Sequence, residues 1–257
     1  MSLTPVAAAE CPFKLWRTYK GTEIYHHKTL GAYAYVTRHN AVDADGAPNA
    51  YHPGDVGKNC LKDAHLGLDC PGNAGYPKTD WWDQVLVVDP ANAQKPYVQP
   101  SGEFAGFFVT KTWLSDPQKA ATDPGKYVDS TKVPYIVFPG SKFAVLKGTG
   151  DKGDVGFALN RDTGKSTSFI VADKGGGSDA KLGEASISFF EALGGENINA
   201  RNGDGVAEGN TLFVVFPHSR KASSPIWPRT NEDVSAQVDT LMKALGGDRD
   251  VLKACGF

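Results

Sequence analysis

Hydrophobic residues along this chain occur in short bursts that are bounded by turn-forming residues. Short apolar runs between Gly, Pro, Asn and Asp are typical of β-strands. Residues 22–40 alternate Tyr, Ala and Val, which predicts one or two strands there. The later bursts are QVLVVDP (84–90), AGFFVTKTWL (105–114), VPYIVFPG (133–140), KFAVLKG (142–148), DVGFALN (154–160), TSFIVAD (167–173) and TLFVVFPHS (211–219). At least seven strands in an antiparallel or barrel-like arrangement are predicted.

Helical periodicity is restricted to two segments. GEASISFFEALGG (183–195) spaces its apolar residues for one face of a helix and ends at Gly194. NEDVSAQVDTLMKALGG (231–247) predicts a second amphipathic helix, with Asn231 or Asp233 near its cap. The predicted fold is therefore mostly β (α+β), a single barrel-like antiparallel or mixed β domain with two or three helices.

No internal repeat or low-complexity linker divides the 257 residues. We expect residues 1–20 to be an N-terminal tag or extension and residues 21–257 to form one catalytic domain. The first ten residues, MSLTPVAAAE, lack the basic start and apolar core of an export signal. They are consistent with a mature protein whose signal has been removed.

The charge distribution changes this picture in one region. The whole chain has a formal net charge of −2, which provides no basic field for nucleic acid or acidic membranes. Between His39 and Pro90, however, eight aspartates face three lysines, so this window carries −5. It is either a solvated loop region or a surface that attracts a cationic ligand.

Four cysteines indicate a secreted protein with two disulfide bonds. Of the three possible pairings we favour Cys60–Cys70, within one polar loop, and Cys11–Cys255, which joins the two ends of the chain. No apolar run is long enough to span a membrane. We expect a monomer that has no nucleic-acid or membrane partner.

Several chemical motifs are incomplete. DTGKST (162–167) lacks the first glycine of a phosphate-binding loop and fits a hairpin turn around Gly164. The Asp43-x-Asp45-Gly46 start of a calcium loop lacks an acidic residue at its twelfth position, Gly54. The histidines lack metal-site spacing, so neither a metal nor a cofactor is expected.

The segment FIVADKGGGSDAKLGEASISFF (169–190) contains the best candidates for catalysis. Asp173 ends a predicted strand, and Glu184 lies where a helix is predicted to begin. The first turn of a helix favours an ionised carboxylate, which would suit Glu184 to the role of base. The local pattern alone favours the plain structural interpretation, a strand-end Asp and a helix-capping Glu.

Six segments in one order resemble the fungal and bacterial chitosanases of glycoside hydrolase family 75. The resemblance covers about two-thirds of the chain, from Tyr33 to Gly195. The segments are DADGAPNAYHP (43–53), GLDCPGNAGYP (67–77), FFVTKTWLSDP (107–117), VPYIVFPG (133–140), GDVGFALNRDTGK (153–165), and FIVADKGGG with LGEASI (169–187).

The resemblance implies a secreted endo-chitosanase that hydrolyses the β-1,4 bonds of chitosan with inversion, using an Asp/Glu pair. The family's catalytic residues correspond to Asp173 and Glu184, with Glu as the proton donor. Here the loop between them is two residues longer than in the family, and KGGGSDAK replaces a Gly-Pro turn. Inversion requires the two carboxyl groups to lie about 6.5–9.5 Å apart.

Substrate binding would use further acidic and aromatic side chains, because the amines of glucosamine are protonated at mildly acidic pH. The candidates are Asp43, Asp45, Asp69, Asp154, Trp81, Trp82 and Trp113. Each Trp fits a sugar-stacking surface or a packed core equally well. The alternative functions are a non-catalytic polysaccharide-binding homologue of the family and a hydrolase of a related β-glucan.

Overall fold

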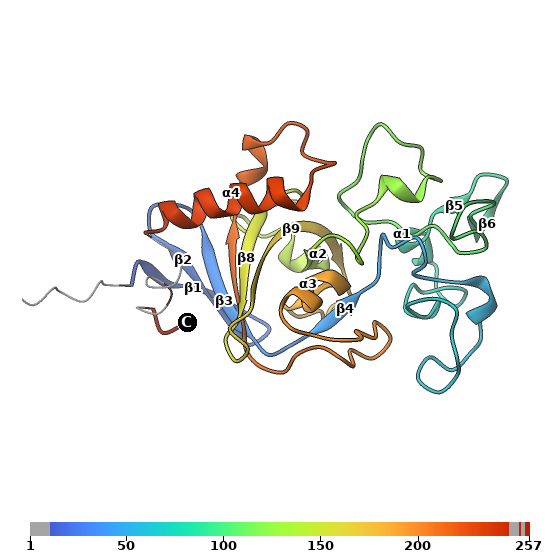
Figure 1. The fold of residues 1–257 in the computed structure, drawn as a ribbon, viewed down its shortest axis with the longest axis horizontal. Coiled ribbons are helices and arrows are strands. Elements are labelled where there is room, and N and C mark those ends of the chain that lie inside the picture. The colour runs from blue at the N-terminus through green and yellow to red at the C-terminus, as the bar shows by residue number, and fades with distance from the viewer. Residues whose placement is uncertain (1–10, 247–251, 253–254) are drawn as a thin grey trace, which may run out of the picture.

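The structure is a computed structural model that describes residues 11–246, 252 and 255–257. Its centre is a nine-stranded sheet with the order β1-β2-β3-β11-β8-β9-β7-β10-β4 (Figure 1). The strands of this sheet are β1 (Phe13–Tyr19), β2 (Thr22–His27), β3 (Tyr33–Thr37), β4 (Ala41–Asp43), β7 (Tyr135–Pro139), β8 (Val155–Asn160), β9 (Ser166–Gly175), β10 (Glu184–Ser186) and β11 (Thr211–Phe216).

The sheet is mixed and open. β7 pairs with β9 in parallel, and β10 pairs with β4 in parallel, whereas the other neighbours are antiparallel. β1 and β4 are its two edges, so the sheet does not close into a barrel. The mostly-β prediction is confirmed and the barrel-like detail is not. Residues Phe13–Tyr19 form the edge strand β1, so they belong to the sheet rather than to an N-terminal extension.

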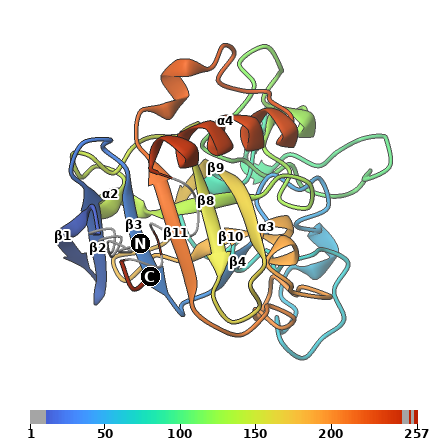
Figure 2. The same ribbon diagram turned by 60° about the vertical axis from the view of Figure 1, so that its left-hand side comes forward.

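Helices cover both faces of the sheet (Figure 2). On one face α4 (Asn231–Ala244) lies across β11, β8 and β9, and Val234, Val238 and Met242 enter a core with side chains of these strands. On the other face α3 (Ile187–Ala192) and α2 (Gly140–Phe143) contribute to a second core rich in phenylalanine. The residue that caps α4 is Thr230, whose hydroxyl accepts a hydrogen bond from the Asp233 N–H.

Residues 44–134 form a long irregular segment beyond β4, on the opposite side of the sheet from β1 to β3 (Figure 1). The segment contains α1 (Trp82–Val85), the pair β5 (Val88–Asp89) and β6 (Asn92–Pro96), and the 3-10 turns Pro53–Asp55 and Pro124–Lys126. It has its own small core, in which Tyr51, Leu86 and Phe108 are buried. AGFFVTKTWL forms only isolated bridges here, so the strand predicted for it is wrong.

Two other predicted elements differ from the structure. KFAVLKG is not a strand, because the chain turns into α2 at Gly140 and then into further turns. The helix predicted at 183–195 begins only at Ile187, after Ser186, whose hydroxyl accepts the Phe189 N–H. Glu184 therefore belongs to a strand and not to the first turn of a helix.

Both predicted disulfides are present. Cys11 pairs with Cys255 at a Cα–Cα distance of 4.7 Å, and Cys60 pairs with Cys70 at 5.7 Å. Such bonds persist in oxidising compartments, so they are compatible with a secreted protein. Across the described residues, no helix combines the length and the apolar character needed to cross a bilayer.

Candidate active site

A cleft of about 1010 Å³ lies between the β4 edge of the sheet and the irregular segment 44–134. Five carboxylic acids line it: Asp43, Asp45, Asp69, Asp173 and Glu184. All five were predicted from the sequence as catalytic or substrate-binding residues. The loop that follows β9 contributes a further wall through Gly175, Gly176 and Gly177. The structure thus brings together acids that are up to 141 residues apart in the chain (184 − 43).

A bulge in β9 decides where Asp173 points. Ile136 of β7 pairs with Val171, but the next residue, Val137, pairs with Asp173, so Ala172 is an extra residue in β9. A one-residue shift moves a side chain to the other face of a sheet. The bulge therefore places Asp173 on the Val137 face, which lines the cleft, instead of the phenylalanine-rich face.

The pairing of the next two strands places Glu184 and Asp43 on the same face. Ala185 pairs with Ile136, so Glu184 lies beside Val137 with β7 between it and Asp173. Ser186 pairs with Asp43 in the parallel β10–β4 ladder, and Glu184 lies two residues before Ser186. Side chains two residues apart on a strand share a face. Three acids from β9, β10 and β4 consequently face the cleft together.

Asp173 is held by backbone donors. Its Oδ1 accepts hydrogen bonds from the N–H of Trp113 at 3.0 Å and from its neighbour Lys174 at 2.8 Å. Burial, and then the charge of Asp43, raise the pKa of Asp173 well above its usual range, while the two N–H groups oppose this shift. These contacts fix the direction of the carboxylate.

Glu184 has a different environment. Among the described residues none donates a hydrogen bond to its carboxylate, and burial followed by the charge of Asp43 raises the pKa of Glu184 to about 8. A helix N-terminus would have lowered this pKa, but Glu184 precedes the first residue of α3 by three positions. The expectation that the helix would make Glu184 a base is therefore wrong, because burial dominates.

Asp43 and Asp45 lie next to this pair. Burial raises the pKa of Asp43 to about 6, and Asp43 Oδ1 accepts the Asp45 N–H at 2.8 Å. Asp45 Oδ1 accepts the hydroxyls of Tyr51 and Thr110, each at 2.9 Å. Burial and the charges of the nearby aspartates raise the pKa of Asp45 well above its usual range. The cleft thus concentrates acids that cannot all be ionised without strong repulsion.

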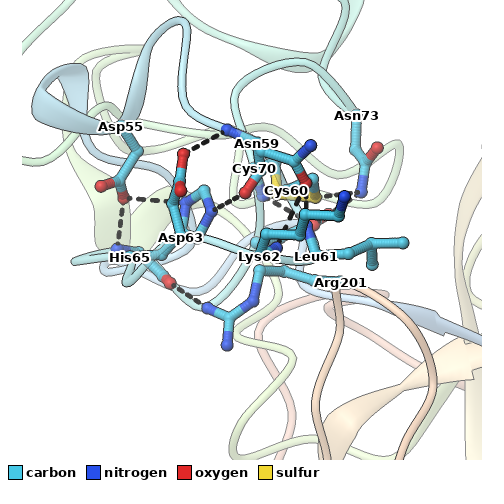
Figure 3. Close-up of a disulfide and its surroundings, with 12 residues drawn as sticks. Asp55, Asn59, Cys60, Leu61, Lys62, Asp63, His65, Cys70, Asn73 and Arg201 are labelled. Carbon is cyan, nitrogen blue, oxygen red and sulfur yellow. Dashed lines mark hydrogen bonds and ion pairs between the residues drawn. A yellow bond between two sulfur atoms is a disulfide. The ribbon is translucent and has the colours of Figure 1, made fainter.

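Asp69 is the fifth acid and adjoins the Cys60–Cys70 disulfide, whose surroundings Figure 3 shows. Its Oδ1 accepts the Cys70 N–H and the Asn73 side-chain amide, both at 2.7 Å. Burial raises the pKa of Asp69 to about 6. Asp69 lies near Tyr51 as well, with the Tyr51 hydroxyl 3.5 Å from Oδ2, so Tyr51 connects it to Asp45.

The three candidate tryptophans have different positions. Trp81 lines the cleft and is 40% exposed, so its indole is available to a ligand. Trp113 also lines the cleft, but the Lys174 and Lys152 ammonium groups lie 4.7 and 5.8 Å from the centroid of its ring. Trp82 does not line the cleft, and its ring packs edge-on against Tyr76.

Asp154 does not belong to the cleft. It is 0% exposed at the start of β8, and it accepts the N–H groups of Asp151 at 2.8 Å and Arg220 at 3.0 Å. Asp154 therefore joins the turn before β8 to the residues after β11, which is a structural role. The structure does not bring Asp154 together with the other predicted substrate-binding acids.

Three of the acids are close enough to share a cation. One carboxylate oxygen from each of Asp43, Asp45 and Asp173 lies within 4.8 Å of the others. Carboxylate oxygens are the preferred ligands of Ca²⁺ and Mg²⁺ in proteins. The same oxygens are equally suited to a protonated amine, which also carries positive charge.

Several cleft residues were not singled out in the sequence. Tyr51 and Asn73 lie in the segments Asp43–Pro53 and Gly67–Pro77 that carry the family resemblance, so a signal for them existed. Lys111 lies in a third such segment, Phe107–Pro117. Burial lowers the pKa of Lys111, and its ammonium donates to the Asp83 carbonyl. Comparison of the chain with protein-family models gives no match, and comparison with curated proteins also gives none.

Proposed function

We propose that this protein is an inverting endo-hydrolase of a β-1,4-linked glucosamine polymer, a chitosanase, with Glu184 as general acid and Asp173 as general base. One observation carries the proposal. Two carboxyl groups, that of the buried Asp173 and that of the half-buried Glu184, differ in their hydrogen-bond environments and face one cleft. Their two strands flank a single intervening strand, β7. The resemblance of the ordered segments to family 75 chitosanases supports the same chemistry.

The spacing of the strands suits inversion. Asp173 and Glu184 are separated by β7, so their Cα atoms lie about 10 Å apart, twice the spacing of neighbouring strands. An inverting glycosidase needs its two carboxyl groups about 6.5–9.5 Å apart, to admit a water between the base and the sugar. Directly adjacent strands would have favoured the shorter spacing of a retaining enzyme.

The reaction follows from the two environments. Glu184, with a pKa of about 8, keeps its proton at neutral pH and transfers it to the glycosidic oxygen as the C1–O bond breaks. Asp173, whose carboxylate is oriented by two N–H groups and whose ionised form is favoured by the positive charge of a bound aminosugar, accepts a proton from the water that attacks C1 from the opposite face. Glu184 ends ionised and Asp173 protonated, and exchange with solvent restores both.

The remaining acids suit a cationic substrate. Asp43, Asp45 and Asp69 lie in the same cleft as the reacting pair, so an ammonium group on the sugar would meet carboxylates there. A bound positive charge favours the ionised form of a nearby acid, so substrate and carboxylates stabilise each other. Trp81 offers an exposed apolar surface for a sugar ring beside them.

A substrate panel with two matched variants tests the proposal. The wild type should release reducing ends from chitosan but not from colloidal chitin or carboxymethylcellulose. Asp173→Asn and Glu184→Gln should each lower kcat by at least ~100-fold, because each variant loses general base or general acid catalysis. NMR of the first product should show the α-anomer.

Three results would count against the proposal. Binding of chitosan without any release of reducing ends between pH 4 and 7 would identify a binding protein instead. Turnover of carboxymethylcellulose alone would identify a β-glucan hydrolase. Full activity in both carboxamide variants would place the chemistry elsewhere in the chain.

A further inference from the structure

The chain between Asp55 and Leu66 forms a self-contained loop, which we call the disulfide loop (residues 56–65). Its ends meet at the buried Asp55 carboxylate, which accepts the N–H groups of Leu66 and Gly67 and the Lys58 ammonium. Its tip is held by Asn59, whose side chain accepts the N–H groups of Leu61 and Lys62. The loop therefore keeps its own shape through hydrogen bonds within residues 55–67.

The link between the disulfide loop and the cleft wall is the Cys60–Cys70 bond (Figure 3). Within the described part of the chain, the one hydrogen bond from this loop to residues 69–76 joins the Asn73 amide to Cys60 Sγ at 3.9 Å. Sulfur is a weak acceptor. The covalent bond thus decides whether the loop stays on Asn73.

Asn73 in turn contacts Asp69. The same Asn73 amide donates to Asp69 Oδ1 at 2.7 Å, and the Asp69 side chain faces the cleft while the residue is 5% exposed. The main chain of Asp69 is fixed independently, since its N–H donates to the Ala50 carbonyl at 2.9 Å. The disulfide can therefore affect the direction and hydration of the Asp69 carboxylate without moving its backbone.

We propose that the Cys60–Cys70 disulfide is a positioning element of the cleft, which holds the disulfide loop over Asn73 and so keeps the Asp69 carboxylate buried and aimed at substrate. This role rests on the proposed function in so far as it takes the bound ligand to be an aminosugar. The Cys11–Cys255 bond lies at β1 and the C-terminal end of the chain, and it serves as a matched control.

The first test does not depend on activity. Carbon-13 NMR follows the titration of the Asp69 carboxyl in the wild type, where its midpoint is expected at about 6. In Cys60→Ser/Cys70→Ser the midpoint should fall toward ~3.9, because the carboxyl becomes hydrated. In Cys11→Ser/Cys255→Ser it should stay unchanged even if the melting temperature falls. An unchanged midpoint in both variants would overturn the proposal.

If Cys60→Ser/Cys70→Ser does not fold, the same test is made by reducing the Cys60–Cys70 bond in protein that has already folded. In Cys11→Ser/Cys255→Ser only the Cys60–Cys70 bond remains. A phosphine reduces it to two thiols, and the phosphine takes up the oxygen of one water as it becomes the phosphine oxide. The Asp69 midpoint should then fall in the same way, and a constant midpoint after complete reduction refutes the role.

Kinetics give the second test. Loss of a positioned charge contact should raise KM for chitosan ~10-fold in Cys60→Ser/Cys70→Ser while kcat stays within about twofold. In an Asp69→Asn background the same cysteine changes should have no further effect on KM, since their target is already removed. An equal effect in both backgrounds refutes action through Asp69. If the wild type proves inactive, the proposed function fails, and the NMR result still decides the role of the disulfide.

Discussion

Replacing Asp43 by Asn should change the pH dependence of catalysis by a predictable amount. The charge of Asp43 is one of the two causes, after burial, of the raised pKa of Glu184. Glu184 pairs with Ala41 on β4, and Asp43 lies two residues further along the same strand. Neighbouring strands lie about 4.8 Å apart, and two residues along a strand span about 6.6 Å. The Cα atoms of Glu184 and Asp43 are therefore about 8 Å apart.

This separation sets the size of the effect. Two charges about 8 Å apart at an effective dielectric constant of 20 interact by about 2 kcal/mol. That energy corresponds to about 1.5 pKa units. The pKa of Glu184, about 8 in the wild type, should therefore fall to about 6.5 in Asp43→Asn. A general acid loses activity as the pH rises through its pKa, so the alkaline limb of kcat should move to lower pH.

The measurement is kcat for chitosan hydrolysis between pH 4 and 9, for the wild type and for Asp43→Asn. The acid limb should also move to lower pH, because Asp43 raises the pKa of Asp173 as well. Asp239→Asn, on an exposed position of α4, is the control for loss of one aspartate and should leave both limbs in place. An alkaline limb that shifts by less than ~0.3 units in Asp43→Asn would show that Glu184 is not the acid or that its charge coupling to Asp43 is negligible.

Three further outcomes follow from the structure. Asp43 has a folded-state pKa of about 6, above the ~3.9 of an unfolded chain, so its burial costs stability progressively as the pH rises from ~4 to about 6, and the cost is constant above that. Asp43→Asn should therefore raise the free energy of unfolding by up to ~3 kcal/mol at pH 8 and change it little at pH 3, as measured by urea titration. Asp154→Leu leaves the N–H groups of Asp151 and Arg220 without the buried carboxylate that accepts them, and urea titration should show a loss of ~2–4 kcal/mol. Trp81→Ala should raise KM for chitosan ~10-fold at constant kcat if the exposed indole carries a sugar ring, and an unchanged KM would exclude that contact.

Local patterns were sufficient for the elements built from neighbouring residues. The β8–β9 hairpin follows from two apolar bursts around a turn in which Gly164 has a φ of 72°. Asp173 was placed near the end of β9 for the same reason. The Cys60–Cys70 bond followed from two cysteines that flank one polar loop.

Long-range pairing explains what the local patterns missed. Residues Glu184–Ser186 look like the start of a helix, but they form a strand because β4, from a distant part of the chain, pairs with them. The bulge at Ala172 has no local signal either, since it appears only when β9 is aligned with β7. Asp154 directly precedes a strand, a position that a cleft acid can also occupy, so the sequence pattern does not reveal its role. Its structural role is visible only from the backbone N–H groups of Asp151 and Arg220 that donate to its carboxylate.

The single extra residue in β9 also makes the site depend on strand register. If β9 paired with β7 by a regular ladder beyond Val171, Ala172 would lie opposite Val137 and Asp173 opposite Phe138, so the Asp173 side chain would face the phenylalanine-rich core. Every acid of the cleft would still be encoded, yet Asp173 would lie on the wrong face of the sheet. Two chains with the same five acids would therefore differ in whether Asp173 reaches the cleft, according to whether β9 carries this bulge.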